Sequence, residues 1–403
     1  MLTNYKQASD FEADARKVAQ QVRGALAGAF DVVQVDARRP IQVSRRLGLE
    51  RNLGWKVCKI ITESEPLAAI SSVAGRPSQA ALLDSLRRAG VPHVSVRALE
   101  DGLDAFERMV AIHAGERETL DRLLAGLGGE KRAEREKAYR KQAFQGNSVI
   151  WGVQTRVRLA MLIVYPDAKS KRYSTAIVTG FIDFQFLRSG VSWPLMGMRL
   201  RSDAGGEMSL ERLTPIDPGV TDPDAYPALR EFCSPNMPPC RATKDEHGVR
   251  FLAPEGMVGL PGKFTCVTGF KLPCVEDSKD SHADFGALVQ IPAETLQHDM
   301  FMHESLASKV RPEFQLNSAL PDETQFLHAA SWRNPLPVAE ELHDLGTGLA
   351  NLTTPDVHAY PKMVETVLRH LAVNPNEFRC FRFAMQYPPM PSRATFRYPH
   401  LRD

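Results

Sequence analysis

Apolar residues recur at helical spacing at the start of the chain. One amphipathic helical face is formed by Phe11, Ala15, Val18, Val22, Leu26 and Phe30. This 3.6-residue period predicts a long helix with one buried side. Ser9 or Asp10 is its expected N-cap.

The segment from Arg38 to Ile61 indicates two short helices joined by a glycine. Pro40 suits the first turn of a helix, where its missing N–H is not needed. Gly48 lies where the first helix must stop, a position that often requires positive φ. The second helix has apolar residues at helical spacing, namely Leu53, Val57, Ile60 and Ile61.

This stretch resembles the helix-turn-helix of bacterial transcriptional regulators through Ser44, Gly48 and the Leu53/Val57 pair. Ser44 occupies the inner angle, where a small side chain lets two helices cross closely. Gly54 departs from the usual pattern, because glycine weakens a helix by roughly 1 kcal/mol relative to alanine.

The same stretch is strongly basic, with seven Lys and Arg against a single acid, Glu50. The resemblance implies that the second helix enters the major groove of DNA. The base-facing positions are then Asn52, Trp55 and Lys56, and the phosphate contacts come from Arg45, Arg46, Arg51 and Lys59. Two other interpretations remain open: a solvated face of an ordinary helical hairpin, and a surface for an acidic protein partner.

Proline and glycine residues after Ile61 separate further short helices, so the helical domain is predicted to extend to about residue 98. Pro66 and the Gly75–Pro77 break bracket a short helix, and Ser78–Ala89 indicates another. His93–Arg97 is expected to form a brief strand.

A heptad-like stripe runs from Leu99 to Leu127. Its apolar positions alternate by four and three residues, the spacing of coiled coils. His113, Gly115 and Arg117 interrupt the pattern. We therefore expect either a dimer-forming helix or a helix packed inside its own protomer, with residues 99–146 as a helical linker.

At Asn147 the hydrophobic period changes from 3.6 to 2, which marks the start of a second domain, residues 147–403. The alternating stripe from Val149 to Tyr165 predicts a long strand, and Ser174–Leu187 predicts its hairpin partner. Further strands are expected at Val249–Leu252, Phe264–Leu272, Phe285–Ile291 and Arg379–Met385. Helices are expected at Ala293–Val310, Val338–Leu345 and Val357–Leu371. The predicted fold class is α+β, with an antiparallel sheet at the centre of the second domain.

The sequence contains no strong motif for catalysis or metal binding. A GxxxxGK[ST] loop, a GxSxG elbow and an HExxH pair are all missing. A four-thiolate zinc site is disfavoured, because seven and eight residues separate the paired cysteines at 233, 240, 266 and 274.

Two groups of polar residues deserve a structural test. His298, Asp299, His303 and Glu304 form the densest cluster of catalytic residue types. Five residues apart, the two histidines point about 140° apart on a helix and to opposite faces on a strand, so neither geometry favours one shared ion. Asp183 lies in an apolar strand, and Arg156 or Arg158 across the hairpin is its expected partner.

Length and composition indicate a soluble protein of two or three domains, with 403 residues, 43% hydrophobic and 24% charged. Residues 1–145 carry a net charge of +5 and the remainder −3. No secretory signal or 18-residue apolar run is recognisable, so we expect a cytoplasmic protein with reduced thiols.

The sequence thus predicts a DNA-binding transcriptional regulator. It would bind double-stranded DNA, pair with a second copy through Leu99–Leu127, and sense an unidentified small-molecule effector or a partner with its α+β domain. No cofactor or metal is expected. The alternatives are an enzyme whose active site lies in the α+β domain and a protein-interaction scaffold.

Overall fold

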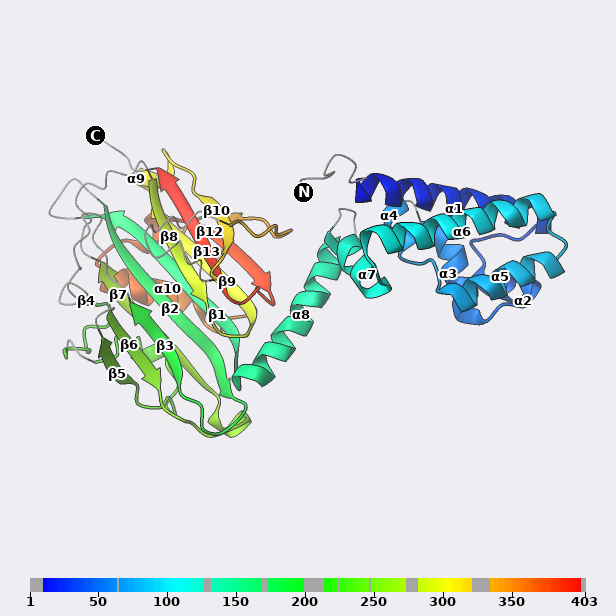
Figure 1. The fold of residues 1–403 in the computed structure, drawn as a ribbon. Helices are drawn as coiled ribbons and strands as arrows, with labels where there is room; N and C mark the ends of the chain where they lie inside the picture. Colours follow the sequence, from blue (N-terminus) through cyan, green and yellow to red (C-terminus); the bar gives the residue numbers. More distant parts are fainter. Residues whose placement is uncertain are drawn as a thin grey trace, which may run out of the picture. The chain divides into compact units, whose positions relative to one another are not determined.

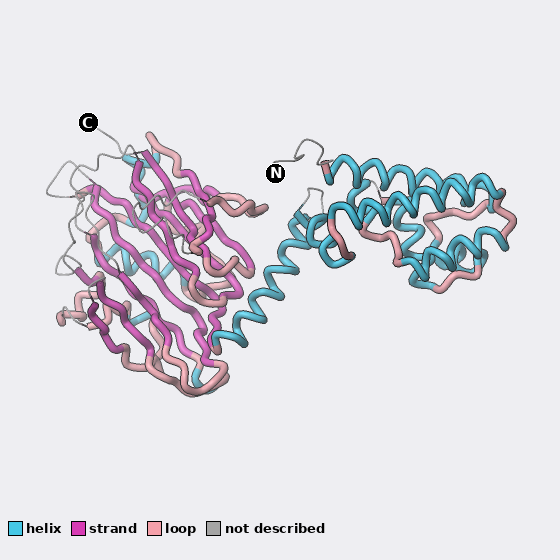
Figure 2. Tube along the Cα trace, viewed as in Figure 1, coloured by secondary structure: helices cyan, strands magenta, loops and turns pink. Residues whose placement is uncertain are grey.

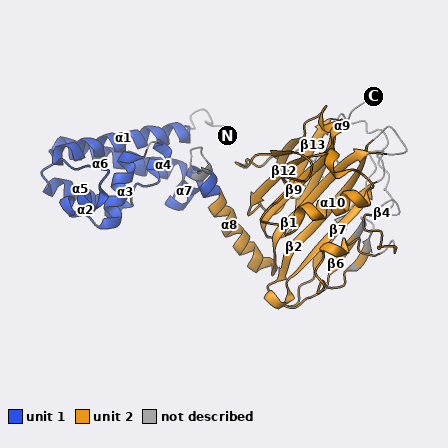
Figure 3. Ribbon diagram, turned by 180° about the vertical axis from the view of Figure 1, so that it is seen from behind, with its two compact units in different colours: residues 1–136 blue, residues 137–403 orange. Residues whose placement is uncertain are grey.

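The structure is a computed structural model that divides into two compact units, residues 1–136 and 137–403 (Figure 3). It describes residues 10–63, 65–126, 132–167, 173–198, 214–222, 225–245, 248–272, 282–320 and 334–399. Helices make up unit 1 and strands dominate unit 2 (Figure 2). The fold is α+β with an N-terminal helical region, as predicted. No helix within these ranges is long and apolar enough to cross a membrane.

Unit 1 is a bundle of helices (Figure 1). They are α1 (Phe11–Val33), α2 (Pro40–Leu47), α3 (Arg51–Thr62), α4 (Pro66–Ile70), α5 (Arg76–Arg88), α6 (His93–His113) and α7 (Arg117–Gly126). Helix α8 (Arg132–Trp151) runs across the unit boundary. The segment predicted as a linker, residues 99–146, is therefore shared between the two units.

Helix α1 supports the bundle. Asp10 caps it by accepting a hydrogen bond from the Glu12 N–H, which satisfies one of the free donors of the first turn. Its predicted apolar face is buried, with Val22 and Leu26 fully inaccessible to solvent. This face packs against α3, α4 and α6, so α1 supplies the core that a bare helix-turn-helix lacks.

Two predictions for the following region are wrong. His93–Arg97 is not a strand but the first turns of α6. The Leu99–Leu127 stripe is not one helix, because Gly115 adopts φ +74° and separates α6 from α7. Its apolar residues Leu99, Leu103, Phe106, Leu120 and Leu124 are buried in the core of unit 1. These residues of the stripe thus belong to the core of unit 1, as the second of the two alternatives expects, and Leu127 lies outside the described residues.

Unit 2 is built mainly from strands. They are β1 (Val153–Pro166), β2 (Tyr173–Phe186), β3 (Trp193–Met198), β4 (Thr214–Pro215), β5 (Arg241–Asp245), β6 (Gly248–Ala253), β7 (Phe264–Leu272), β8 (His282–Val289), β9 (Ala293–His303), β10 (Glu313–Ser318), β11 (His343–Thr347), β12 (Phe378–Gln386) and β13 (Ser392–Pro399). The helices are α9 (Glu304–Ala307) and α10 (Tyr360–His370), with single 3₁₀ turns η2 (Arg230–Phe232), η3 (Leu260–Gly262) and η4 (Pro375–Glu377).

A seven-stranded sheet in the order β11-β12-β9-β1-β2-β7-β4 forms the centre of unit 2. The predicted β1–β2 hairpin is confirmed, with Val157 opposite Ile182. All neighbours in this sheet are antiparallel except β1 and β9, which run parallel. The predicted antiparallel centre is therefore correct apart from that one pair.

Both faces of this sheet are covered. On one side Met161 packs with Val364 of α10, and on the other Leu162 packs with Phe396 of β13. The second layer on that side is the three-stranded sheet β10-β13-β8, and a further sheet, β3-β6-β5, completes the unit. Because neighbouring residues of β1 face opposite layers, the strand is apolar on both sides.

Three other predictions in unit 2 are wrong and one helix is confirmed. Ala293–Val310 is strand β9 followed by the single turn α9, and Val338–Leu345 contains no helix. The stripe from Val149 begins in the last turn of α8, so the strand starts only at Val153. The helix predicted at Val357–Leu371 is present as α10.

Candidate nucleic-acid interface

Helices α2 and α3 are the two short helices that the sequence predicts between Arg38 and Ile61, joined by a turn at Gly48. Gly48 ends α2 with φ +64°, a left-handed conformation that glycine adopts without steric cost. The N–H of Leu49 donates to the Ser44 carbonyl at 2.9 Å, which satisfies an otherwise free acceptor at the end of α2. The chain then reverses and α3 begins at Arg51.

Gly54 lies at the point where α2 and α3 cross. A β-carbon at this position would lie 1.9 Å from Ser44 Oγ and 3.1 Å from Ser44 Cβ. The sequence pattern marks Gly54 as a weak point of α3, because glycine destabilises a helix relative to alanine. The structure assigns it a packing role, because even if the Ser44 hydroxyl rotated away, a β-carbon here would still lie 3.1 Å from Ser44 Cβ and 3.4 Å from Ser44 Cα.

All seven predicted contact residues are exposed, namely Arg45, Arg46, Arg51, Asn52, Trp55, Lys56 and Lys59. Those of α3 alternate with the buried residues Leu53, Val57 and Ile60, so they share the face turned away from the core. The five Arg and Lys residues make no ion pair within the part of the chain that the structure describes. The result is a cluster of uncompensated positive charge on α2 and α3, which we call the α2–α3 basic face.

Two contacts from neighbouring helices fix the position of this motif. Arg23 of α1 donates to the carbonyl oxygens of Ile60, at 3.1 Å, and Glu63, which lie at the C-terminal end of α3. The buried Ser85 hydroxyl of α5 donates to the Leu47 carbonyl at the end of α2. Sequence analysis did not single out Arg23, because no local pattern distinguishes it from the other arginines.

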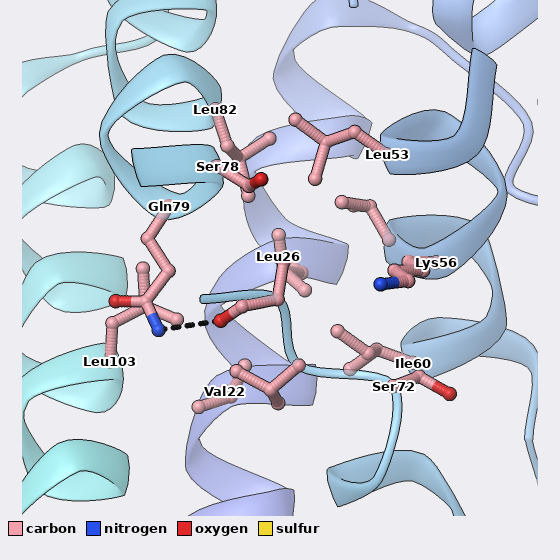
Figure 4. A pocket seen from close by; sticks show the side chains of 13 residues that line it. Val22, Leu26, Leu53, Lys56, Ile60, Ser72, Ser78, Gln79, Leu82 and Leu103 are labelled. Atoms are coloured by element: carbon pink, nitrogen blue, oxygen red, sulfur yellow. Dashed lines mark hydrogen bonds between the residues drawn. The ribbon is translucent and has the colours of Figure 1, made fainter. Parts of the chain in front are cut away.

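A small cavity lies behind α3, between α1, α5 and α6. Figure 4 shows its apolar lining, including Val22, Leu26, Leu53 and Leu82. Gln79 closes one side by donating to the Ala74 carbonyl at 2.8 Å. The cavity volume is about 10 Å³, which is about the room that one water molecule needs. It is part of the core and too small for an effector.

The histidine cluster of unit 2 does not form one site. His298 in β9 is fully buried, and its ring packs edge-on against Phe396 at 4.7 Å. Burial, with the nearby Arg158 charge, lowers its pKa to about 3. His303 ends the strand and contacts Glu377, with Nε2 3.1 Å from the carboxylate. The two imidazoles therefore have separate structural environments.

Asp299 is fully buried and is held by Arg382 of β12 in a bidentate pair, with a shortest contact of 2.7 Å. Tyr360 donates to the same carboxylate at 2.5 Å and Gln297 at 3.2 Å. Burial lowers the pKa of the guanidinium, but the carboxylate outweighs it and raises that pKa overall. The network joins β9, β12 and α10, and its geometry is that of a structural ion pair.

Asp183, the other polar residue that the sequence singles out in unit 2, forms ion pairs in the structure. Asp183 pairs with Arg156 at 2.7 Å, as predicted, and with Lys263 at 3.5 Å. Burial raises its pKa, but these two cations outweigh that effect and lower it. The described residues contain no group of three or more His, Cys, Asp or Glu able to hold a metal. Cys274, the fourth cysteine of the disfavoured zinc site, lies outside the described residues.

One open groove of about 280 Å³ is present in unit 2, between α8 and the turns that precede β9 and follow β12. Its walls are mostly apolar, with Tyr139 and Phe144 from α8 facing Pro292 and Pro388. Arg140 at its edge pairs with Glu340. The volume is just below that of typical ligand pockets, so the groove is a candidate site for a small effector.

Comparisons with known proteins do not assign this chain to a family. No protein-family model matches it, and no curated protein matches it. Among solved structures, a "putative protease" from Parabacteroides distasonis ATCC 8503 is similar at 4% identity with a TM-score of 0.27. The match covers 62% of this chain and 40% of that one. A likeness at this level does not establish a shared fold, and no activity follows from it.

Proposed function

We propose that this protein binds double-stranded DNA in a sequence-specific manner through α2 and α3 and acts as a transcriptional regulator. The α2–α3 basic face is the observation that carries the proposal. Five unpaired cations are exposed on these two neighbouring helices, and an anionic partner would explain their concentration. DNA is the partner that a helix with exposed polar and basic residues on a helix-turn-helix fits.

The residues of the face would divide into two groups, one that contacts bases and one that contacts phosphates. Asn52, Trp55 and Lys56 lie in the first half of α3 and would contact base edges in the major groove. The four arginines and lysines at positions 45, 46, 51 and 59 would hold backbone phosphates and set the register of the helix. Arg23 would act as a positioning residue, because it fixes the C-terminal end of α3 without touching DNA.

Unit 2 would respond to a small molecule or a partner protein. The groove beside Tyr139 and Phe144 supports this role, since its wall is the same continuous helix α8 that leads back into unit 1. A ligand seated there would contact the covalent connection between the two units. Chromosomal DNA as a target would place the protein in the cytoplasm of a bacterial cell.

The proposal is tested by selecting duplexes from a random-sequence DNA pool with the purified full-length protein. We expect an enriched motif. Asn52→Ala should weaken preference at one base pair by about 1–3 kcal/mol. Arg108→Ala, which removes an exposed arginine of α6 outside the motif, is the matched control and should leave the enriched motif unchanged. A selection that enriches no sequence above the pool would contradict specific recognition.

A further inference from the structure

Trp55 has no structural role that explains its place on the α2–α3 basic face. Its side chain is 51% exposed. No aromatic ring or cation stacks on it among the residues that the structure describes. Its neighbours in sequence, Gly54 and Lys56, differ: the first faces Ser44 in the core, whereas the second is exposed and also lines the small cavity behind α3 (Figure 4). Burying the exposed half of this large indole would be favourable, and the free protein does not gain that free energy.

The position of Trp55 within the face is central. Arg51 and Asn52 lie one turn before it, and Lys59 lies one turn after it, all exposed. Cations on both sides would anchor the phosphate backbones and bring the indole toward the groove floor. The ring is thus placed where a bound duplex would remove it from water.

The major groove offers one apolar group to such a ring. All four bases present hydrogen-bonding atoms along this edge, and thymine alone adds an apolar 5-methyl group. Asn52, three residues earlier, carries the amide that pairs bidentately with adenine N6 and N7. Three residues of helix span about 4.5 Å and one base-pair step about 3.4 Å, so the two side chains can address neighbouring base pairs.

We infer that Trp55 reads a thymine through its 5-methyl group and that Asn52 reads an adenine beside it. The target of α3 is therefore a duplex site that contains two neighbouring A·T base pairs. This inference rests on the proposed function and specifies the class of site that the helix selects.

The test replaces thymine by uracil, one position at a time, in the duplex that the selection enriches. Uracil keeps every hydrogen-bonding group and lacks only the methyl. One buried methyl corresponds to about a fourfold change in affinity. We expect one position at which the wild-type protein loses about fourfold, and we expect Trp55→Ala to bind the thymine and uracil duplexes equally. Trp55→Phe should retain part of the difference.

The outcomes separate this inference from the proposed function. Specific binding with no thymine-to-uracil difference at any position overturns the role of Trp55 and leaves DNA recognition standing. A difference that persists unchanged in Trp55→Ala also overturns it, because another residue would then sense the methyl. Tighter binding to the single strand than to the duplex would mean that Trp55 stacks on unpaired bases. A selection without any motif overturns both.

Discussion

A β-carbon on Gly54 would lie 1.9 Å from the hydroxyl oxygen of Ser44. This relationship sets how closely α2 and α3 cross. The crossing in turn determines which side chains of α3 face away from the core. A helix position that sequence alone marks as weak is therefore the contact on which the exposed face depends.

Gly54→Ala is expected to destabilise unit 1 by about 1 kcal/mol. Overpacking at the crossing costs roughly 1–3 kcal/mol, and the better helix propensity of alanine returns about 1 kcal/mol. Gly24→Ala in α1 is the matched control, because nothing lies within 4 Å of its β-carbon. It should stabilise by up to about 1 kcal/mol in urea unfolding. Equal stabilisation by both substitutions would show that the crossing tolerates a side chain.

Arg23→Ala is expected to loosen the last turn of α3. The guanidinium holds the carbonyls of Ile60 and Glu63, and a charged hydrogen bond contributes about 1.5–3 kcal/mol. Amide hydrogen exchange in that turn should accelerate roughly tenfold or more, while exchange in α5 stays unchanged. Lys17→Ala, an exposed cation of the same helix, serves as the control. If both variants exchange alike, Arg23 does not position α3.

The sequence predicts best those elements whose ends are marked by local residues such as proline and glycine. Pro40 and Gly48 fix both ends of α2, and the stripe of α3 is buried as its spacing requires. The predicted contact residues are all exposed because they fill the positions between the buried ones. The pattern could not show what Gly54 packs against, since that depends on the partner helix.

The failures share a physical cause. Strand β9 was predicted as part of a helix because it is buried on both faces, so its apolar residues do not alternate. Leu296 and Met300 are four apart and imitate a helical stripe. The stripe around Gly115 has coiled-coil spacing, but the positive φ there ends the helix. The parallel pairing of β1 with β9 and the Asp299–Arg382 pair join residues far apart in the chain. No pattern of neighbouring residues in the sequence indicates either contact.

His298 makes stability depend on pH. Its pKa is lowered to about 3 in the folded state, and an unfolded histidine has a pKa of about 6.5. The unfolded state therefore binds more protons below pH 6.5, and stability falls as pH falls from 6.5 toward 3. Between pH 7.5 and 5 this contributes a loss of about 2 kcal/mol.

His298→Leu, which has a similar volume and does not titrate, should lack this part of the pH dependence. Chemical unfolding at pH 7.5 and 5 measures the difference, with His303→Gln as the control. A wild-type protein and His298→Leu variant that lose stability equally over this range would contradict the buried neutral imidazole. Unchanged metal content in the purified variant is also expected.

The Asp299–Arg382 pair should behave as a structural unit. Removing either partner leaves the other charge buried and is expected to destabilise by about 3–5 kcal/mol. Asp299→Leu combined with Arg382→Met should cost much less than the sum of the two single changes. A double-mutant cycle by urea unfolding measures this coupling. Additive effects would show that the two groups do not interact in the folded state.

The account's central claim is that the α2–α3 basic face binds DNA, and the salt dependence of affinity tests it most directly. Each neutralised phosphate releases condensed counterion, so phosphate contacts from the four cations at positions 45, 46, 51 and 59 predict a log–log slope of about −3.6 per protomer. Arg46→Ala should reduce the slope by about one and weaken all sequences alike, whereas Arg108→Ala should leave the slope unchanged. Fluorescence anisotropy with labelled duplex between 50 and 200 mM salt gives the slopes. Binding that is undetectable at about 100 mM salt, or a slope that responds equally to both variants, would contradict the claim.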